Sequence, residues 1–118
     1  MAETSTEFEL SPEQASELED AQLVDVRTSA EYDAGHAEGA VHVSLDELQA
    51  AAGGLDRDRP VVFYCRAGER SRMAVDAFRA SGWDAYGLEG GLLAWAERGL
   101  PLEPQGAEVA PFSSIPTA

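Results

Sequence analysis

Apolar and polar residues alternate in blocks along the chain, and these blocks predict strands that alternate with helices. Four short apolar runs have the length and residue types of buried strands. They cover residues 22–26, 40–43, 60–64 and 83–88. Helical stretches are expected over residues 12–20, 29–34, 45–52, 71–81 and 91–98. Because strands that are joined by helices usually pair in parallel, the pattern predicts an α/β fold, with a mainly parallel central sheet and helices on both faces.

Capping residues mark the start of the first helix. Ser11 is a suitable N-cap, Pro12 fits the first helical position, and Gln14 completes a capping box. We expect this helix to run to about Asp20. The helix over residues 45–52 should end at the two glycines that follow it.

The predicted helix over residues 71–81 is amphipathic, and Gly82 provides its C-terminal stop. Its apolar residues fall on one face, which we expect to pack on the sheet. They are Met73, Ala74, Ala77 and Phe78.

Proline is frequent near the C-terminus and argues against further regular structure there. The prolines are Pro101, Pro104, Pro111 and Pro116. Residues 104–118 are therefore expected to form a flexible tail.

Length and composition fit one compact domain. The chain has 118 residues, 44% of them hydrophobic, which is enough for a core without disulfides or metal. Its N-terminus shows no leader pattern and no segment is apolar enough to cross a membrane, so we expect a cytoplasmic protein. Cys65 is the single cysteine, and with only His36 and His42 beside it a closed zinc site is not expected.

The net charge of -14 disfavours nucleic acid and anionic membranes as partners, because the field of the molecule repels polyanions. Two explanations of the charge stay open. One is solubility or codon usage, and the other is adaptation to a salty cytoplasm. The dependence of stability on salt would separate them.

Arginines gather around the cysteine despite the acidic composition. Arg66, Arg70 and Arg72, three of the eight arginines, follow Cys65 within seven positions. The cysteine ends a predicted strand and precedes a predicted helix, so the amides of residues 66–71 can form a nest that points at the sulfur. Gly68 permits the positive φ angle that such a loop needs. We expect a reactive thiolate in an anion-binding loop.

The plainer alternative is a core cysteine. Free cysteine is among the most buried residue types, and a cysteine at the end of an apolar strand is often part of the core. The glycine, the arginines and the helix that follow favour the reactive interpretation.

Three segments resemble the rhodanese domains, in particular the bacterial single-domain sulfurtransferases. LVDVRTSAEYDAGHAEGAVHV, residues 23–43, is similar to the first motif of that family. VVFYCRAGERS, residues 61–71, is similar to its strand and active-site loop, and WDAYGLEGGLLAWAERGLPLE, residues 83–103, to its C-terminal motif. The resemblance implies a single rhodanese-like domain over residues 8–103.

The resemblance also implies a persulfide mechanism without a cofactor. Cys65 would take sulfane sulfur from thiosulfate or another small anionic donor and pass it to a thiol, to cyanide or to a protein cysteine. The loop residues would bind the substrate and stabilise the persulfide. They are Arg66, Ala67, Gly68, Glu69, Arg70 and Ser71. We expect a monomer or a weak homodimer.

Two other functions stay open. One is a non-catalytic or carrier module that binds a partner protein or relays sulfur to it. The other is a phosphatase or an arsenate reductase, because the family that the chain resembles includes phosphatases with the same fold. Their cysteine loop is one residue longer, so the loop here should be too tight for phosphate. Only four residues separate Cys65 from Arg70 here, and Glu69 would repel a phosphate dianion, so this function ranks third.

Other polar and aromatic residues have structural interpretations. We expect Asp25 and Arg27 to form a structural ion pair rather than to contact substrate, and His36 and His42 to be structural histidines. Four aromatic residues have spacings that suit core packing. They are Tyr64, Phe78, Trp83 and Trp95.

Overall fold

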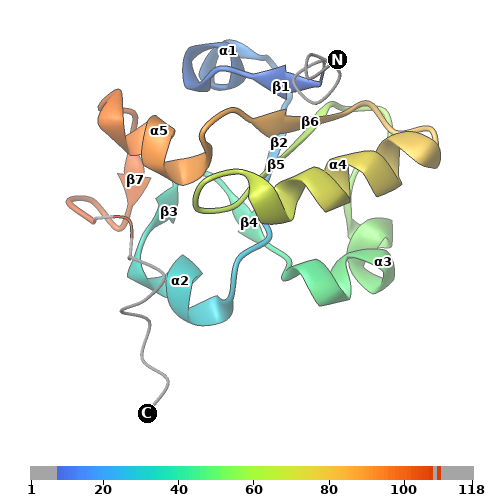
Figure 1. Cartoon of the computed structure of the whole chain (residues 1–118), viewed down its shortest axis with the longest axis horizontal. Coiled ribbons are helices and arrows are strands. Elements are labelled where there is room, and N and C mark those ends of the chain that lie inside the picture. The colour runs from blue at the N-terminus through green and yellow to red at the C-terminus, as the bar shows by residue number, and fades with distance from the viewer. Residues whose placement is uncertain (1–7, 108, 110–118) are drawn as a thin grey trace.

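A five-stranded parallel sheet forms the centre of the computed structural model, which describes residues 8–107 and 109 (Figure 1). The strand order is β1-β6-β5-β2-β4, and neighbouring strands pair in parallel. The strands are β1 (Glu9–Leu10), β2 (Gln22–Asp25), β4 (Val41–His42), β5 (Val61–Tyr64) and β6 (Ala85–Leu88). The predicted α/β fold with a mainly parallel sheet is confirmed.

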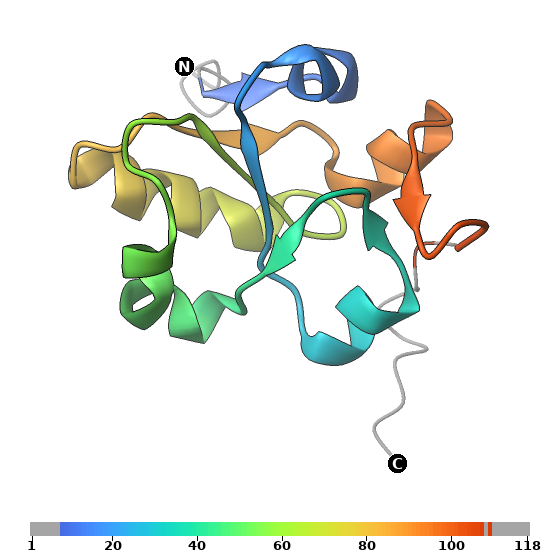
Figure 2. The same ribbon diagram turned by 180° about the vertical axis from the view of Figure 1, so that it is seen from behind.

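Helices cover both faces of this sheet. They are α1 (Pro12–Glu17), α2 (Ser29–Ala34), α3 (Leu48–Ala51), α4 (Glu69–Ala80) and α5 (Gly91–Glu97). In Figure 1 the long helix α4 crosses the front of the molecule, and in Figure 2 it lies behind the strands. All four β5 residues are buried, and they divide between the two hydrophobic clusters of the core. Val61 and Phe63 pack with α4, whereas Val62 and Tyr64 pack with α1 and α5.

A small antiparallel sheet was not predicted. It pairs β3 (His36–Ala37) with β7 (Leu102–Glu103). The expectation that no regular structure follows Pro101 was therefore wrong, because β7 needs only two residues and lies between Pro101 and Pro104. The backbone oxygen of Pro101 also accepts hydrogen bonds from Glu38 and from the Trp95 indole.

Several element boundaries differ from the prediction. The first helix has the predicted capping box, but it ends at Glu17, because the backbone then becomes extended at Leu18. The stretch expected as one helix over residues 45–52 consists of a 3-10 turn (Leu45–Glu47), α3 and a second 3-10 turn (Ala52–Gly54). Helix α4 begins at residue 69, two residues earlier than predicted, so Arg70 lies in its first turn.

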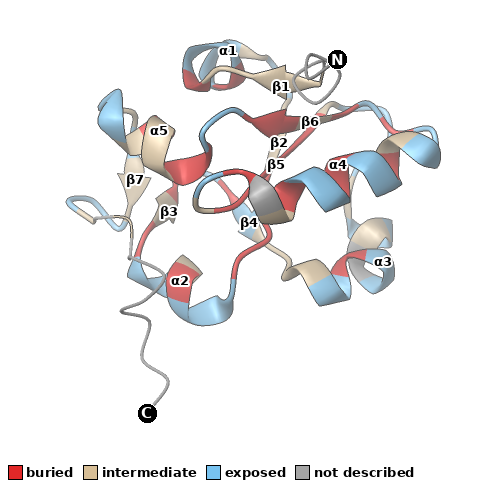
Figure 3. Cartoon of the chain, in the orientation of Figure 1, coloured by how far each residue is buried: buried red, intermediate tan, exposed pale blue. Residues whose placement is uncertain are grey.

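The apolar face of α4 is narrower than predicted (Figure 3). Ala74 and Phe78 are buried, but Met73 and Ala77 are exposed. Met73 points away from the sheet because residues 71, 74, 75 and 78 already fill the buried side of the helix.

The predicted tail lies partly outside the described residues. Residues 108 and 110–118 are not described. The domain limits of 8 and 103 stay a prediction. Within the described residues no helix is long and apolar enough to span a membrane. The same residues contain no group of three or more metal-binding side chains.

Candidate active site

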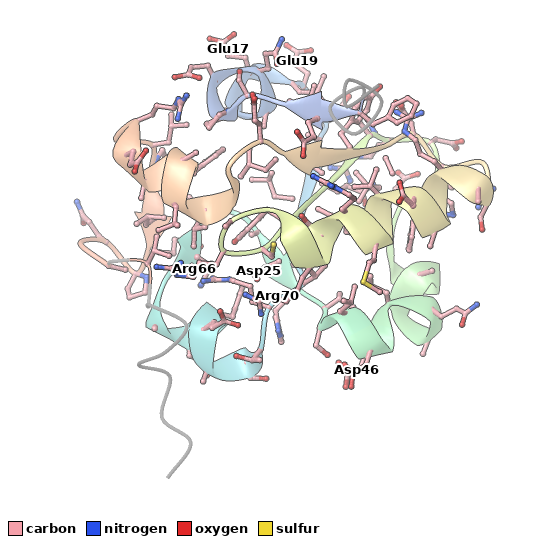
Figure 4. All side chains as sticks on the ribbon, in the orientation of Figure 1. Glu17, Glu19, Asp25, Asp46, Arg66 and Arg70 are labelled. Carbon is pink, nitrogen blue, oxygen red and sulfur yellow. The ribbon has the colours of Figure 1, made fainter. Side chains whose placement is uncertain are left out.

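Cys65 directly follows strand β5 at the carboxyl edge of the sheet. A short loop then leads into α4. The neighbouring strand β2 supports this edge, because the amide of Val26 donates to the carbonyl of Tyr64 at 3.0 Å. In an open parallel sheet, ligands bind outside the carboxyl ends of the strands. Figure 4 shows Arg66, Arg70 and Asp25 grouped at this edge beside the loop.

The sulfur of Cys65 lies inside the loop, where polar groups of Gly68 and Ser71 contact it. The amide of Gly68 donates to Sγ at 3.0 Å, and the thiol donates to the Ser71 hydroxyl at 3.7 Å. The Ser71 hydroxyl donates in turn to the carbonyl of Gly68 at 3.2 Å. The cysteine is only 1% exposed. An amide and a hydroxyl thus surround a sulfur atom that is almost fully withdrawn from water.

Gly68 gives the loop its shape. It is the residue before α4 and has a φ of +118°, a conformation that residues with a Cβ rarely adopt. This turn directs its amide at the sulfur and begins a helix of 12 residues. The positive end of that helix faces the thiol, which favours a negative charge there.

Arg70 is held by Glu31, a partner that sequence reasoning did not identify. The guanidinium makes two hydrogen bonds to the Glu31 carboxylate, at 2.8 and 3.0 Å. Glu31 is fully buried and also accepts from the amide and the hydroxyl of Thr28, at 3.0 and 3.1 Å. The capping-box spacing of Thr28 and Glu31 was visible in the sequence, but nothing in it pointed to Arg70.

These contacts determine the charge of Glu31. Burial alone would raise the pKa of this carboxyl, but the hydrogen bonds from Arg70 and Thr28 outweigh burial and lower the pKa from 4.5 to about 2. The hydrogen bonds between Glu31 and Arg70 also raise the pKa of Arg70. Both side chains are therefore charged at neutral pH, next to the loop.

The other predicted loop residues differ in exposure. Arg66 is partly exposed and Ala67 is exposed, whereas Gly68 and Ser71 are buried. Glu69 begins α4, and its side chain lies outside the described part of the structure. The structure brings the backbones of residues 65–71 together around the sulfur. Their role as a substrate site stays a prediction.

A second segment that was not predicted to take part anchors the loop from α5. The amides of Leu92 and Leu93 donate to the carbonyls of Cys65 and Arg66, at 2.9 and 3.1 Å. This close approach requires glycine at position 91, because a Cβ there would lie 2.5 Å from the Arg66 carbonyl oxygen. Two adjacent glycines before an apolar run are the only sequence signal of this contact.

A buried ion pair supports the edge of the sheet beneath the loop. Arg27 Nη2 lies 2.6 Å from Asp25 Oδ2, with both side chains fully buried, so the predicted structural pair is confirmed. Nη2 also donates to the carbonyl of Gly35 at 2.7 Å. Among the described residues, Arg27 Nη1 has no hydrogen-bond partner. The Arg27 guanidinium carbon lies 5.8 Å from the centre of the Tyr64 ring.

Both histidines are bonded to backbone carbonyls, as expected of structural residues. His36 Nδ1 lies 2.9 Å from the Tyr32 oxygen, and His42 Nε2 lies 2.7 Å from the Arg27 oxygen.

The four aromatic residues predicted for the core are all buried there.

Comparisons with known proteins agree on one family. The family model of the rhodanese-like domain matches residues 11–98. A sulfurtransferase of Allochromatium vinosum is 37% identical over 87 residues, which cover 73% of this chain and 81% of that protein. An HTH-type transcriptional regulator of Mycobacterium tuberculosis is 42% identical over 90 residues, which cover 74% of this chain but only 39% of the regulator.

A solved structure has the same fold. The rhodanese-related protein of Thermoplasma volcanium superposes with a TM-score of 0.75 at 26% identity, over 80% of this chain and 95% of that one.

Proposed function

The chain belongs to the rhodanese-like domain family, and from this membership we propose that it is a sulfurtransferase in which Cys65 carries sulfane sulfur as a persulfide. The observation that carries the proposal is the environment of the Cys65 sulfur. Sγ accepts a hydrogen bond from the Gly68 amide at the start of a 12-residue helix. The Allochromatium relative is a sulfurtransferase, which supports the same reaction class.

The first half-reaction loads the cysteine. The Cys65 thiolate attacks the outer sulfur of thiosulfate and forms a new S–S bond, while the bond to the sulfonate sulfur breaks and its electron pair leaves with sulfite. In the second half-reaction a thiolate or cyanide attacks the outer sulfur of the persulfide. The Cys65 thiolate then departs as the leaving group, so the enzyme returns to its starting state by a ping-pong scheme.

The loop favours the anionic forms that both steps require. The Gly68 amide and the end of α4 stabilise negative charge at the sulfur. The Ser71 hydroxyl lies 3.7 Å from Sγ, and by rotating away from the Gly68 carbonyl it can donate to the thiolate. The scheme assigns no general base, because the Gly68 amide and the start of α4 favour the thiolate as the attacking form.

The test is the mass of the intact protein after a short incubation with thiosulfate, with Cys65→Ser as the matched control. The wild type should gain about 32 Da, one sulfur atom, and lose it when cyanide or glutathione is added. The serine variant should gain nothing, because its hydroxyl is not a nucleophile of comparable strength.

Loading by a small persulfide donor but not by thiosulfate would assign the chain to the carrier alternative, in which a dedicated donor supplies the sulfur. No gain with either donor would contradict the proposal.

A further inference from the structure

A groove runs along α4 away from the candidate active site. Two cavities form it, one of about 480 Å³ beside Arg70 and one of about 390 Å³ beside Trp83. Leu45, Asp46 and Met73 line both cavities, so the two meet at these residues. We refer to this feature as the α4 groove.

Met73 lies at the junction of the two cavities and is 64% exposed. Among the described residues, Val41 at 49% is the other exposed large hydrophobic residue. Methionine is unbranched and flexible, and it is frequent on surfaces that bind varied apolar partners. The exposed methionine thus continues an apolar surface from the Arg70 end of the groove to Phe78 and Trp83 of the core.

The charge at the groove is negative. Asp46 lines both cavities, and its neighbour Glu47 adds a second carboxylate. The two cations that line the cavity beside Arg70 are each paired with a carboxylate, Arg27 with Asp25 and Arg70 with Glu31. The chain as a whole has a net charge of -14, so it attracts cationic partners over a distance.

We propose that the α4 groove docks an extended, positively charged segment of a partner protein, whose cysteine takes the sulfur from Cys65. This inference rests on the proposed function. The acceptor cysteine lies at the Arg70 end, a basic side chain lies opposite Asp46, and an apolar side chain fills the cavity beside Trp83. Docking would hold the acceptor cysteine at a high effective concentration beside the loop, which speeds its reaction with the persulfide.

The length of the helix sets the spacing within the segment. From Arg70 to Phe78 the helix rises about 12 Å, at about 1.5 Å per residue. An extended chain covers this distance in about four residues, at about 3.3 Å each. The apolar side chain should therefore lie about four residues from the cysteine.

The test uses wild-type protein first loaded with sulfur and then mixed with blocked peptides of the sequences CGRGL and CGRGS, or the reversed LGRGC and SGRGC. The rate at which the protein loses about 32 Da is measured by mass. In at least one chain direction, the leucine peptide should unload the wild type about tenfold faster than the serine peptide, because the leucine is buried in the groove. The ratio of the two rates within one protein cancels any change in loading.

Met73→Glu should bring this ratio close to one, since it places a charge where the two cavities meet. Val41→Glu is the matched control, because it adds the same charge at the other exposed large hydrophobic residue, and it should keep the wild-type ratio. Replacing the peptide arginine by glutamate should slow transfer from the wild type to the peptide, and Asp46→Asn should reduce that difference in rate.

Equal rates for the leucine and serine peptides with the wild type would overturn the inference, as would a ratio that survives Met73→Glu. A ratio that falls as the protein concentration rises, together with dimers in sedimentation, would assign the groove to a second copy and also overturn it. A protein that cannot be loaded at all would contradict the proposed function itself, and this result is distinct from a loaded protein without peptide preference.

Discussion

The side chain of Glu31 connects two parts of the candidate site that are 39 residues apart in the sequence. It caps α2 through Thr28 and fixes the guanidinium of Arg70 in the first turn of α4. A buried carboxylate without partners would be costly, but here hydrogen bonds satisfy both of its oxygens. Glu31 is therefore a positioning residue for the loop and does not contact the sulfur.

Glu31→Gln should reduce the free energy of unfolding by about 3 kcal/mol at pH 7, because it leaves Arg70 without its buried anion. Because the pKa of Glu31 is about 2 in the folded protein and 4.5 ordinarily, its contribution is present above pH 4.5 and is lost as the pH falls towards 2. The difference between wild type and variant should shrink over this interval. Chemical denaturation at a series of pH values measures it.

Glu13→Gln is the control for this experiment. The ion pair of Glu13 with Arg98 is exposed at both ends, so its loss should change stability by at most about 1 kcal/mol. If the difference in the free energy of unfolding between wild type and Glu31→Gln stays constant from pH 6 to pH 3, the stabilising role of the Glu31 carboxylate is contradicted.

Gly68 is the second residue on which the loop depends. Gly68→Ala should slow the loading of Cys65 by about tenfold or more, because the residue leaves its φ of +118° and turns its amide away from the sulfur. Gly39→Ala is the matched control for Gly68→Ala, because Gly39 also has a positive φ with open space around it. Both variants should lose similar stability, and similar loading rates would argue against a role of the Gly68 amide.

At the scale of elements, the loop is held between the starts of two helices. Helix α4 supplies the amide that faces the sulfur, and α5 binds the carbonyls of residues 65 and 66 from the other side. The carbonyls of residues 65 and 66 thus receive hydrogen bonds from α5, while the amide of Gly68 faces the sulfur. On this side the loop is fixed by backbone contacts with α5. Its shape there depends on the close approach of the two backbones.

Gly91→Ala tests this arrangement. The new Cβ would lie 2.5 Å from the Arg66 oxygen and 2.7 Å from the Cys65 oxygen, so the two backbones must separate. We expect a loss of about 2 kcal/mol beyond that of Gly99→Ala, together with slower loading of Cys65. Gly99 has a similar positive φ but open space around it, so the comparison isolates the close contact. Equal losses in the two variants would contradict the anchoring role.

Elements with strong local signals were predictable, and elements that depend on distant partners were not. The capping box at Ser11 and the buried strand at residues 61–64 follow from neighbouring residues alone. The pairing of β3 with β7 joins residues more than 60 positions apart, and nothing in either segment indicates it. The exposure of Met73 also depends on the packing of the whole helix.

The same limit applies to the candidate site. The position of Cys65 between strand and helix, and the shape of the glycine turn, could be predicted from the local sequence. The partner of Arg70 and the contact at Gly91 could not, because both are long-range. The sequence favoured a substrate contact for Arg70, which stays a prediction, and the structure adds its pairing with Glu31.

At the scale of the whole molecule, the acidic excess should make stability depend on salt. Repulsion among 22 acidic residues opposed by 8 arginines is screened as ionic strength rises. We expect the melting temperature to rise by about 5 °C between about 0.02 and 0.5 M sodium chloride. A rise that continues well above 1 M would favour adaptation to a salty cytoplasm over the solubility explanation.

A variant with Glu17→Gln and Glu19→Gln controls for unspecific effects of salt. Both residues are exposed, at the edge of the molecule opposite Asp46 (Figure 4). The variant should melt at a higher temperature in low salt and respond less to added salt. Identical responses of variant and wild type would argue against charge repulsion as the cause.

The burial of the single thiol has a consequence for following the folding of this protein. The loop that covers Cys65 is held by residues from two distant segments, around positions 31 and 92, so it is intact only when these parts of the domain are assembled. A thiol reagent too bulky to enter the loop can therefore react quickly only with molecules that have opened, in contrast to the small sulfur donors of the proposed reaction. With one cysteine per chain there is one such signal, and its rate reports the population of opened molecules without any attached label.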